Sequence, residues 1–272
     1  MGIDMDVHRQ RFLDYTERFV DVPDAAPLRL KTVHTFRVYE HARTITASLG
    51  QDRREARFGS DTGLCRAAEL AALYHDCGRF PQFKRYRTFL DAASVDHALL
   101  SFKTMRDEGL VKEEPGRVRG LAQCAVLLHN RHILPQKLSA EARFVTDVVR
   151  DADKLDIFRI MVEHLQSALP EKDAVLLHVK EDPDCWTPRV FEDVMAGRVA
   201  RYSDLRYVND FRLLLGTWMF ELRFAATRHA VAASGLMDAV LDGLPRKAGL
   251  MPALDVLYSR LEACRRDKGE AF

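Results

Sequence analysis

Apolar residues return at steps of three and four positions along almost the whole chain. In residues 28–49, Val33, Val38, Ile45 and Leu49 follow this spacing, which is the period of one face of an α-helix. The same pattern predicts further helices over residues 6–20, 61–76, 94–108, 118–129, 140–169, 188–197, 203–233, 235–243 and 251–265. The one β-like apolar run, residues 174–179, is short. We therefore predict an all-α fold.

Residues typical of helix ends support these boundaries. The predicted N-caps are Asp61, Ser94 and Ser139. The predicted stops are Gly50, Gly109 and Pro170. Residues 51–60 are expected to form a charged loop, and residues 81–91 a basic, aromatic loop. Because no linker or repeat interrupts the pattern, we predict a single domain over residues 1–272, in which the C-terminal third packs against the first five or six helices.

Composition narrows the class of protein. The 272 residues carry a formal net charge of +1, which gives no electrostatic case for nucleic acid or an anionic membrane as a partner. No apolar run approaches the roughly 20 residues that span a bilayer, and the N-terminus does not resemble a secretory signal. The five cysteines form no CxxC pair. Reduced thiols and a cytoplasmic location are the expectation.

The pair His75-Asp76 ends an apolar helical stretch and is the strongest candidate for chemistry. Adjacent helical side chains point about 100° apart, so both reach one point only near a helix end or around a metal. Gly78 and Pro81 are predicted to end the helix just after the pair. Imidazole nitrogen together with carboxylate oxygen suits a divalent metal.

Four other polar residues stand where a site could use them. His34 lies on the apolar face of its predicted helix, where a lone histidine is more often a satisfied core residue. Asp153 lies on the buried face of a long helix, where a carboxylate needs a partner or a metal. His97 and His129 fall near helix ends; singly, each would more often be a capping or surface residue.

Together these residues resemble the HD-domain superfamily of metal-dependent phosphohydrolases. The family's pattern H…HD…D is matched by His34, His75, Asp76 and Asp153, and the run 152–156, ADKLD, resembles its last motif. The resemblance implies an HD-type helical bundle over about 28–165, with additional C-terminal helices over about 171–265. It also implies a divalent metal cofactor of one or two ions, with Mn, Ni, Zn, Fe, Co and Mg not distinguished.

Two-metal members of the superfamily add histidines between the pair and the last aspartate. His97 and His129 stand in that order, so the resemblance implies a second ion, with Asp76 as the bridge between the two. His132 shares a helical spacing with His129 but precedes the predicted helix end at Pro135, which disfavours it as a ligand. His41, two turns beyond His34, is expected to be core or pocket wall.

Substrate binding requires a cation near the metal site. Related families often carry a lysine or arginine at the position of Arg79, and a guanidinium can hold phosphate oxygens in a bidentate manner. Lys154, next to Asp153, is the second candidate.

Lys84 and Arg85 are expected to be solvated. The loop aromatics Phe80, Phe83, Tyr86 and Phe89 are expected either to wall a pocket or to anchor the loop to the core. Asn130 is placed to donate to substrate or to orient His129.

The leading functional hypothesis is hydrolysis of a small phosphate ester, such as a nucleotide or related metabolite, through metal-activated water. Asp76, Arg79 and Lys154 are the predicted catalytic residues. The GYP signature of cyclic-dinucleotide phosphodiesterases is absent after Gly78. The Cys77 side chain is interpreted as filling space in the core.

The alternative functions are a di-iron oxygenase of the inositol-oxygenase type and a non-catalytic HD sensor module. Substrate identity and oligomeric state, including a homo-oligomer, stay open.

Overall fold

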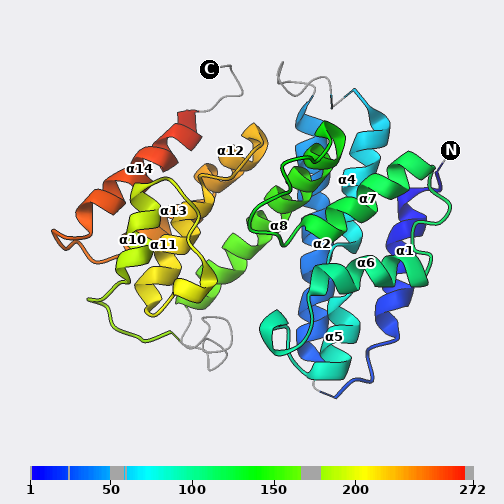
Figure 1. Cartoon of the computed structure of the whole chain (residues 1–272), viewed down its shortest axis with the longest axis horizontal. Coiled ribbons are helices and arrows are strands. Elements are labelled where there is room, and N and C mark those ends of the chain that lie inside the picture. Colours follow the sequence, from blue (N-terminus) through cyan, green and yellow to red (C-terminus); the bar gives the residue numbers. More distant parts are fainter. Residues whose placement is uncertain (1, 24, 50–57, 59, 167–178, 267–272) are drawn as a thin grey trace. The chain divides into compact units, whose positions relative to one another are not determined.

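The all-α prediction is confirmed by the structure, a computed structural model (Figure 1). It describes residues 2–23, 25–49, 58, 60–166 and 179–266. Within these ranges the regular elements are helices, and extended pairing is limited to one isolated parallel bridge between Lys180 and Tyr207. None of the described helices combines the length and apolar character needed to cross a bilayer.

The chain divides into two compact units, and the division falls inside one helix. The boundary lies between Asp153 and Lys154. Both belong to α8 (Ala140–Gln166), which therefore contributes its first half to one unit and its second half to the other. The prediction of a single domain over the whole chain stays a prediction.

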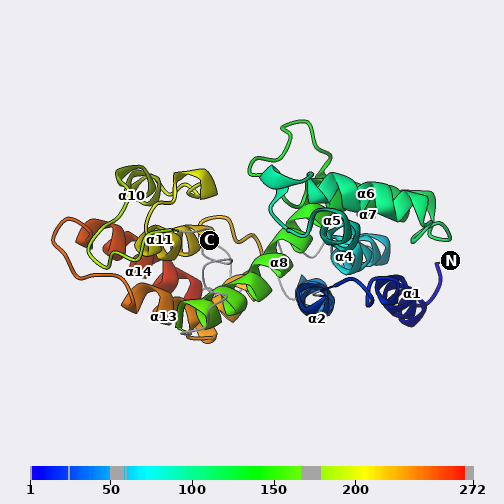
Figure 2. The same cartoon turned by 90° about the horizontal axis from the view of Figure 1, so that it is seen from below.

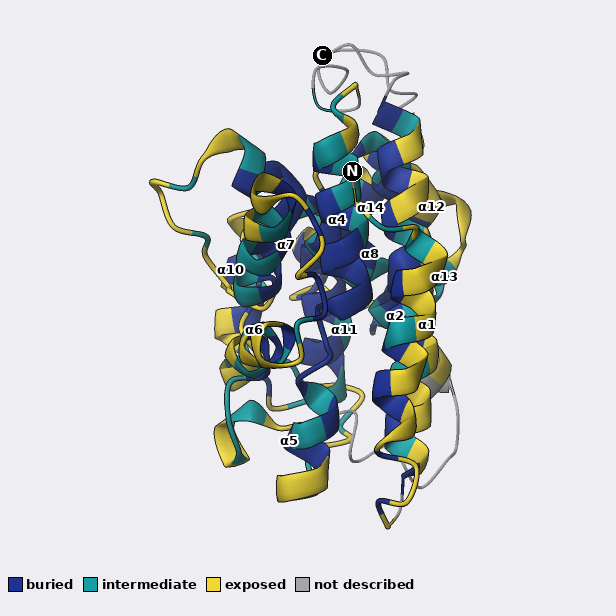
Figure 3. Cartoon of the chain, turned by 90° about the vertical axis from the view of Figure 1, so that its right-hand side faces the viewer, coloured by how far each residue is buried: buried dark blue, intermediate teal, exposed yellow. Residues whose placement is uncertain are grey.

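The first unit is built around α4 (Figure 3). Its helices are α1 (Met5–Glu17), α2 (Ala26–Ser48), α4 (Thr62–Tyr74), α5 (Arg79–Tyr86), α6 (His97–Asp107), α7 (Gly116–Leu128) and the first half of α8, with a short η2 (Asp91–Ala93). α4 packs against α2 and α7, and α6 packs against α7. The fully buried alanines of α4 let its neighbours approach closely: Ala67, Ala68, Ala71 and Ala72. The C-terminal end of α4 is thereby fixed from several sides.

The segment after α4 departs from the prediction. Residues 81–91 were expected to form a loop, but α5 covers Arg79–Tyr86. Pro81 lies in the first turn of α5, where the missing N–H removes no helical hydrogen bond. Gly78 marks a close contact between helices, because a Cβ there would collide with the backbone of Ser101 on α6. Its N–H donates to Ser101 Oγ at 2.9 Å. The pair His75-Asp76 therefore lies in a tight turn between two helices.

Two predicted N-caps are confirmed and one is wrong. Asp61 accepts from the N–H groups of Gly63 and Leu64 at the start of α4, and Ser139 Oγ accepts from Ala142 N–H at the start of α8. Ser94, however, does not cap α6. Asp96 does so, accepting from the second and third N–H groups of that helix at 3.0 and 3.2 Å. As a result α6 begins at His97.

The second unit contains the remaining helices (Figure 2). They are the second half of α8, α10 (Pro188–Met195), η3 (Tyr202–Asp204), α11 (Val208–Trp218), α12 (Ala225–Ala233), α13 (Leu236–Asp242) and α14 (Met251–Arg266). The single helix predicted over residues 203–233 is wrong, since the chain leaves helical structure between Trp218 and Ala225. Most of α11 is buried at the centre of this unit's apolar core. The predicted stops Gly50 and Pro170, and all of the β-like run 174–179 except Val179, lie outside the described residues.

Candidate metal centre

His75 presents one ring nitrogen to the interior of the first unit. It is the C-cap of α4 and is fully buried. Its Nδ1 lies 2.8 Å from the carbonyl oxygen of Ala72, so this nitrogen carries the proton and donates. Its Nε2 is buried and has no hydrogen-bond partner among the described residues. Because an unpaired buried acceptor is costly, this lone pair fits the role of a metal ligand.

One group of donor atoms surrounds that nitrogen. Asp153 Oδ1 lies 3.2 Å from His34 Nε2 and 3.7 Å from His75 Nε2. Asp76 Oδ2 lies 3.8 Å from His34 Nε2 and 3.6 Å from His75 Nε2. These four side chains come from α2, α8 and the turn after α4. The structure thus brings together the four residues that the H…HD…D pattern selects.

A second group shares Asp76 with the first. Asp76 Oδ1 lies 3.7 Å from His97 Nε2 and 3.9 Å from His129 Nε2, and the two Nε2 atoms lie 3.2 Å apart. His97 is the first residue of α6 and His129 is the C-cap of α7, so the predicted helix-end positions are correct. One Asp76 oxygen therefore faces each group of histidines.

The spacing and burial of these atoms suit divalent ions. Ligand atoms that each lie ~2.1 Å from one ion are separated from each other by about 3–4 Å. In the triads His34–His75–Asp153 and His75–Asp76–His129 the ligand atoms all lie within 4.8 Å of one another, close to this spacing. His75 belongs to both, and the mixture of imidazole and carboxylate is typical of manganese, iron, cobalt, nickel or zinc.

Burial and neighbouring charges set the protonation states that metal binding needs. Burial favours the neutral acid at Asp76, but the charges of Lys31 and Arg79 hold the pKa of that carboxyl well below its ordinary value. Burial likewise opposes ionisation of Asp153, yet the close contact with His34 lowers the pKa of this carboxyl. For the histidines, burial lowers the pKa of His75, and burial with His97 nearby lowers that of His129 to about 3. The carboxylates are therefore ionised and these imidazoles neutral near pH 7.

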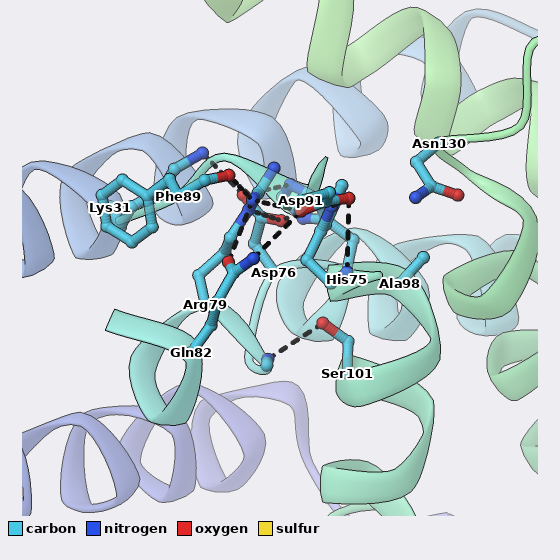
Figure 4. Close-up of polar contacts among 12 residues, drawn as sticks. Lys31, His75, Asp76, Arg79, Gln82, Phe89, Asp91, Ala98, Ser101 and Asn130 are labelled. Atoms are coloured by element: carbon cyan, nitrogen blue, oxygen red, sulfur yellow. Dashed lines mark hydrogen bonds and ion pairs between the residues drawn. The ribbon is translucent and has the colours of Figure 1, made fainter. Parts of the chain in front are cut away.

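Arg79 lies beside Asp76 and is held by several acceptors (Figure 4). Its Nε donates to Asp76 Oδ1 at 3.3 Å, and its Nη1 contacts Asp91 Oδ1 at 3.0 Å and the carbonyl oxygen of Phe89 at 2.6 Å. Its Nη2 has no hydrogen-bond partner among the described residues, which leaves that donor for a ligand. Lys154, by contrast, pairs with Glu221 Oε2 at 2.7 Å within the second unit. Its predicted contact with a phosphate stays a prediction.

Two residues beside the site escaped the sequence analysis. Lys31 Nζ donates to Asp76 Oδ2 at 2.7 Å. The sequence spacing could have indicated Lys31, because it precedes His34 by three residues and so lies on the same face of the helix. Asp91 Oδ2 lies 2.6 Å from His97 Nδ1 and orients that ring, while its Oδ1 accepts from Arg79. No spacing in the sequence pointed to Asp91.

Other candidates lie around the site in different roles. Asn130 donates to Asp96 Oδ1 at 3.0 Å, so it joins the end of α7 to the cap of α6 rather than bonding to His129. His132 is exposed, as are Lys84 and Arg85. Phe80 and Phe83 are buried and anchor α5. Burial raises the pKa of the Cys77 thiol, which supports its interpretation as packing.

Comparison with known families matches residues 32–157 to the HD domain, which spans all six residues of the site. Residues 32–157 thus form an HD domain, and this match together with the grouped histidines and aspartates supports membership of the HD-domain superfamily. HD domains bind divalent metals and are commonly metal-dependent hydrolases, although some are non-catalytic. The matched range lies within the predicted core of about 28–165. Searches of the curated proteins and of the solved structures each found no match.

The buried neutral histidines predict how stability depends on pH. Below pH 6.5 the unfolded chain binds protons at His75 and His129, whereas the folded chain does not, because their folded pKa values are lower. The free energy of unfolding of chelator-treated protein should therefore fall as the pH is lowered through about 6.5. Each such histidine contributes a loss of about 1.4 kcal/mol per pH unit until its folded pKa is reached.

Urea unfolding followed by far-ultraviolet circular dichroism at pH 7.5 and 5.5 measures this dependence. Tryptophan fluorescence is unsuitable, because Trp186 and Trp218 both lie in the second unit. His129→Gln should flatten the pH dependence, and the exposed His132→Gln should leave it unchanged. Equal slopes in the two variants would contradict the assignment.

Proposed function

We propose that this protein is a metal-dependent phosphohydrolase that acts on a small phosphate ester. The observation that carries the proposal is the position of Asp76, whose two oxygens face two separate groups of histidine nitrogens. In this proposal His34, His75, Asp76 and Asp153 hold one ion, and Asp76, His97 and His129 hold a second. When bound, such a pair of ions activates a water molecule and neutralises phosphoryl oxygens.

The chain's own residues supply the remaining requirements. Backbone carbonyls fix the ring orientation of His75 and His129, and Asp91 fixes that of His97. Asp91 also holds Arg79, whose Nη2 is left to donate to a phosphoryl oxygen. One carboxylate thus positions both a proposed metal ligand and the proposed phosphate-binding cation. Substrate binding and metal binding are coupled through this contact.

Activity with a defined metal tests the proposal. Protein treated with a chelator is reloaded separately with Mn²⁺, Ni²⁺, Zn²⁺, Fe²⁺, Co²⁺ or Mg²⁺ and assayed against a panel of nucleotides and other small phosphate esters. We expect phosphate release from at least one ester, with at least one metal, and none in the chelated sample. Oxygen uptake by the iron-loaded sample is followed in parallel. Oxygen consumption without phosphate release would overturn the proposal in favour of an oxygenase.

A further inference from the structure

Lys31 and Arg79 approach the same carboxylate from two different helices (Figure 4). Lys31, on α2, donates to Asp76 Oδ2 at 2.7 Å, and Arg79, on α5, donates to Asp76 Oδ1 at 3.3 Å. Lys31 therefore stands at the oxygen that faces His34 and His75, and Arg79 at the oxygen that faces His97 and His129. The two cations flank the centre of the candidate site.

Phe89 joins the two cations. The Lys31 ammonium and the Arg79 guanidinium carbon each lie 5.8 Å from the centre of its ring. The carbonyl oxygen of Phe89 also accepts from Arg79. Because both side chains contact Phe89 and both donate to Asp76, Lys31 and Arg79 lie within reach of a single ligand.

The two cations are more exposed than the pair His75-Asp76. The side chains of His75 and Asp76 are 0% and 4% exposed, whereas those of Arg79 and Lys31 are 14% and 23% exposed. The two cations are therefore nearer to water than His75 and Asp76. The Lys31 side chain has more freedom to reorient than that of Arg79, because its ammonium sits on a flexible four-carbon stem and has three donors. Among the described residues, Asp76 is the one hydrogen-bond acceptor of this ammonium.

The charge of the site suits a ligand with two negative charges. The carboxylates of Asp76, Asp91 and Asp153 together with Lys31 and Arg79 leave one net negative charge. Two divalent ions would leave three net positive charges, enough for a dianion and one hydroxide. A divalent ion on Asp76 also competes with Lys31 for that carboxylate, which favours transfer of the ammonium to another anion.

From these contacts we propose that Lys31 and Arg79 together bind the terminal phosphoryl group of a phosphate monoester, and that Lys31 selects monoesters over diesters. The proposal rests on the proposed function and deepens it. Lys31 turns from Asp76 to a phosphoryl oxygen on one side of Phe89, while Arg79 Nη2 donates to another oxygen of the same group. A diester carries one negative charge less and gains less from the second cation.

Lys31→Met tests this, with Lys31→Arg as the charge-preserving variant. Arg29→Met is the matched control, because it removes a positive charge from an exposed position on the same helix. Calorimetric titration of the manganese-loaded proteins with inorganic phosphate should show roughly 10- to 100-fold weaker binding in Lys31→Met. Lys31→Arg and Arg29→Met should bind phosphate as the wild type does. The ratio of activities on p-nitrophenyl phosphate and bis-p-nitrophenyl phosphate should fall by a similar factor only in Lys31→Met.

Metal content, measured on each variant, separates the outcomes. Full metal content with weakened phosphate binding supports the proposal. Unchanged phosphate affinity and monoester preference in Lys31→Met would overturn it, as would loss of metal from that variant, since Lys31 would then only position Asp76. These results leave the proposed function untouched. That function fails independently if the metal-loaded wild type hydrolyses no phosphate ester.

Discussion

Replacing Asp76 with asparagine is expected to abolish binding of both ions and to reduce phosphate release at least about a thousandfold. Asp76 offers one oxygen to each group of histidines, so no other residue of the site can replace it. Asparagine keeps the shape but loses the charge, and its amide nitrogen cannot act as the second ligand atom. Loss of two ions removes several kcal/mol of transition-state stabilisation, and each 1.36 kcal/mol corresponds to a factor of ten in rate.

Elemental analysis and initial rates measure both effects on the same samples. Asp107→Asn is the matched control, because Asp107 is an exposed aspartate on α6 of the same unit. Circular dichroism must show that Asp76→Asn still folds, since Lys31 and Arg79 each donate to a different oxygen of Asp76 and asparagine keeps only one oxygen. Wild-type metal content or turnover in folded Asp76→Asn would refute the shared-ligand role.

The second large effect is the loss of one of the two ions when a histidine of only one group is replaced. His34→Ala should lose the ion held with His75 and Asp153, and His129→Ala should lose the ion held with His97. Each variant is expected to retain one ion per chain and to lose at least about a hundredfold in turnover, because a two-metal site needs both charges around the reacting phosphoryl group. The retained ion differs between the two variants, although the stoichiometry is the same.

The exposed His132→Ala serves as the control and should keep two ions and full turnover. Removal of both ions by either single substitution would show that the groups bind metal as one unit. Two ions in His129→Ala would remove His129 from the set of ligands.

Much of the site was predictable because its residues follow helical spacing or stand at helix ends. His34 and Asp153 interrupt apolar faces of long helices, where a polar residue needs an explanation. His75, His97 and His129 each lie at a helix end, where a side chain can turn toward a neighbouring helix. Helical spacing and helix-end positions are kept in the folded structure, so the residues that share these features can come together in space.

The parts that could not be predicted depend on contacts between distant segments. α5 was hidden because Gly78 and Pro81 are usual signs of a helix end, yet here the glycine allows contact with α6 and the proline opens a new helix. Asp91 reaches His97 through a turn with no regular period. The partner of Lys154 is Glu221, which lies 67 residues further along the chain. Lys31 is different, because its helical spacing from His34 is visible in the sequence and could have placed it at the site.

The central claim is that one centre, bridged by Asp76, both holds two ions and hydrolyses a phosphate ester. It is tested most directly by phosphate release from a responsive ester while divalent metal is added stepwise to chelator-treated protein. We predict that release is absent without metal, rises with bound metal and reaches its plateau at two ions per chain. Release that is independent of metal, or its absence at every loading with every metal, would contradict the claim.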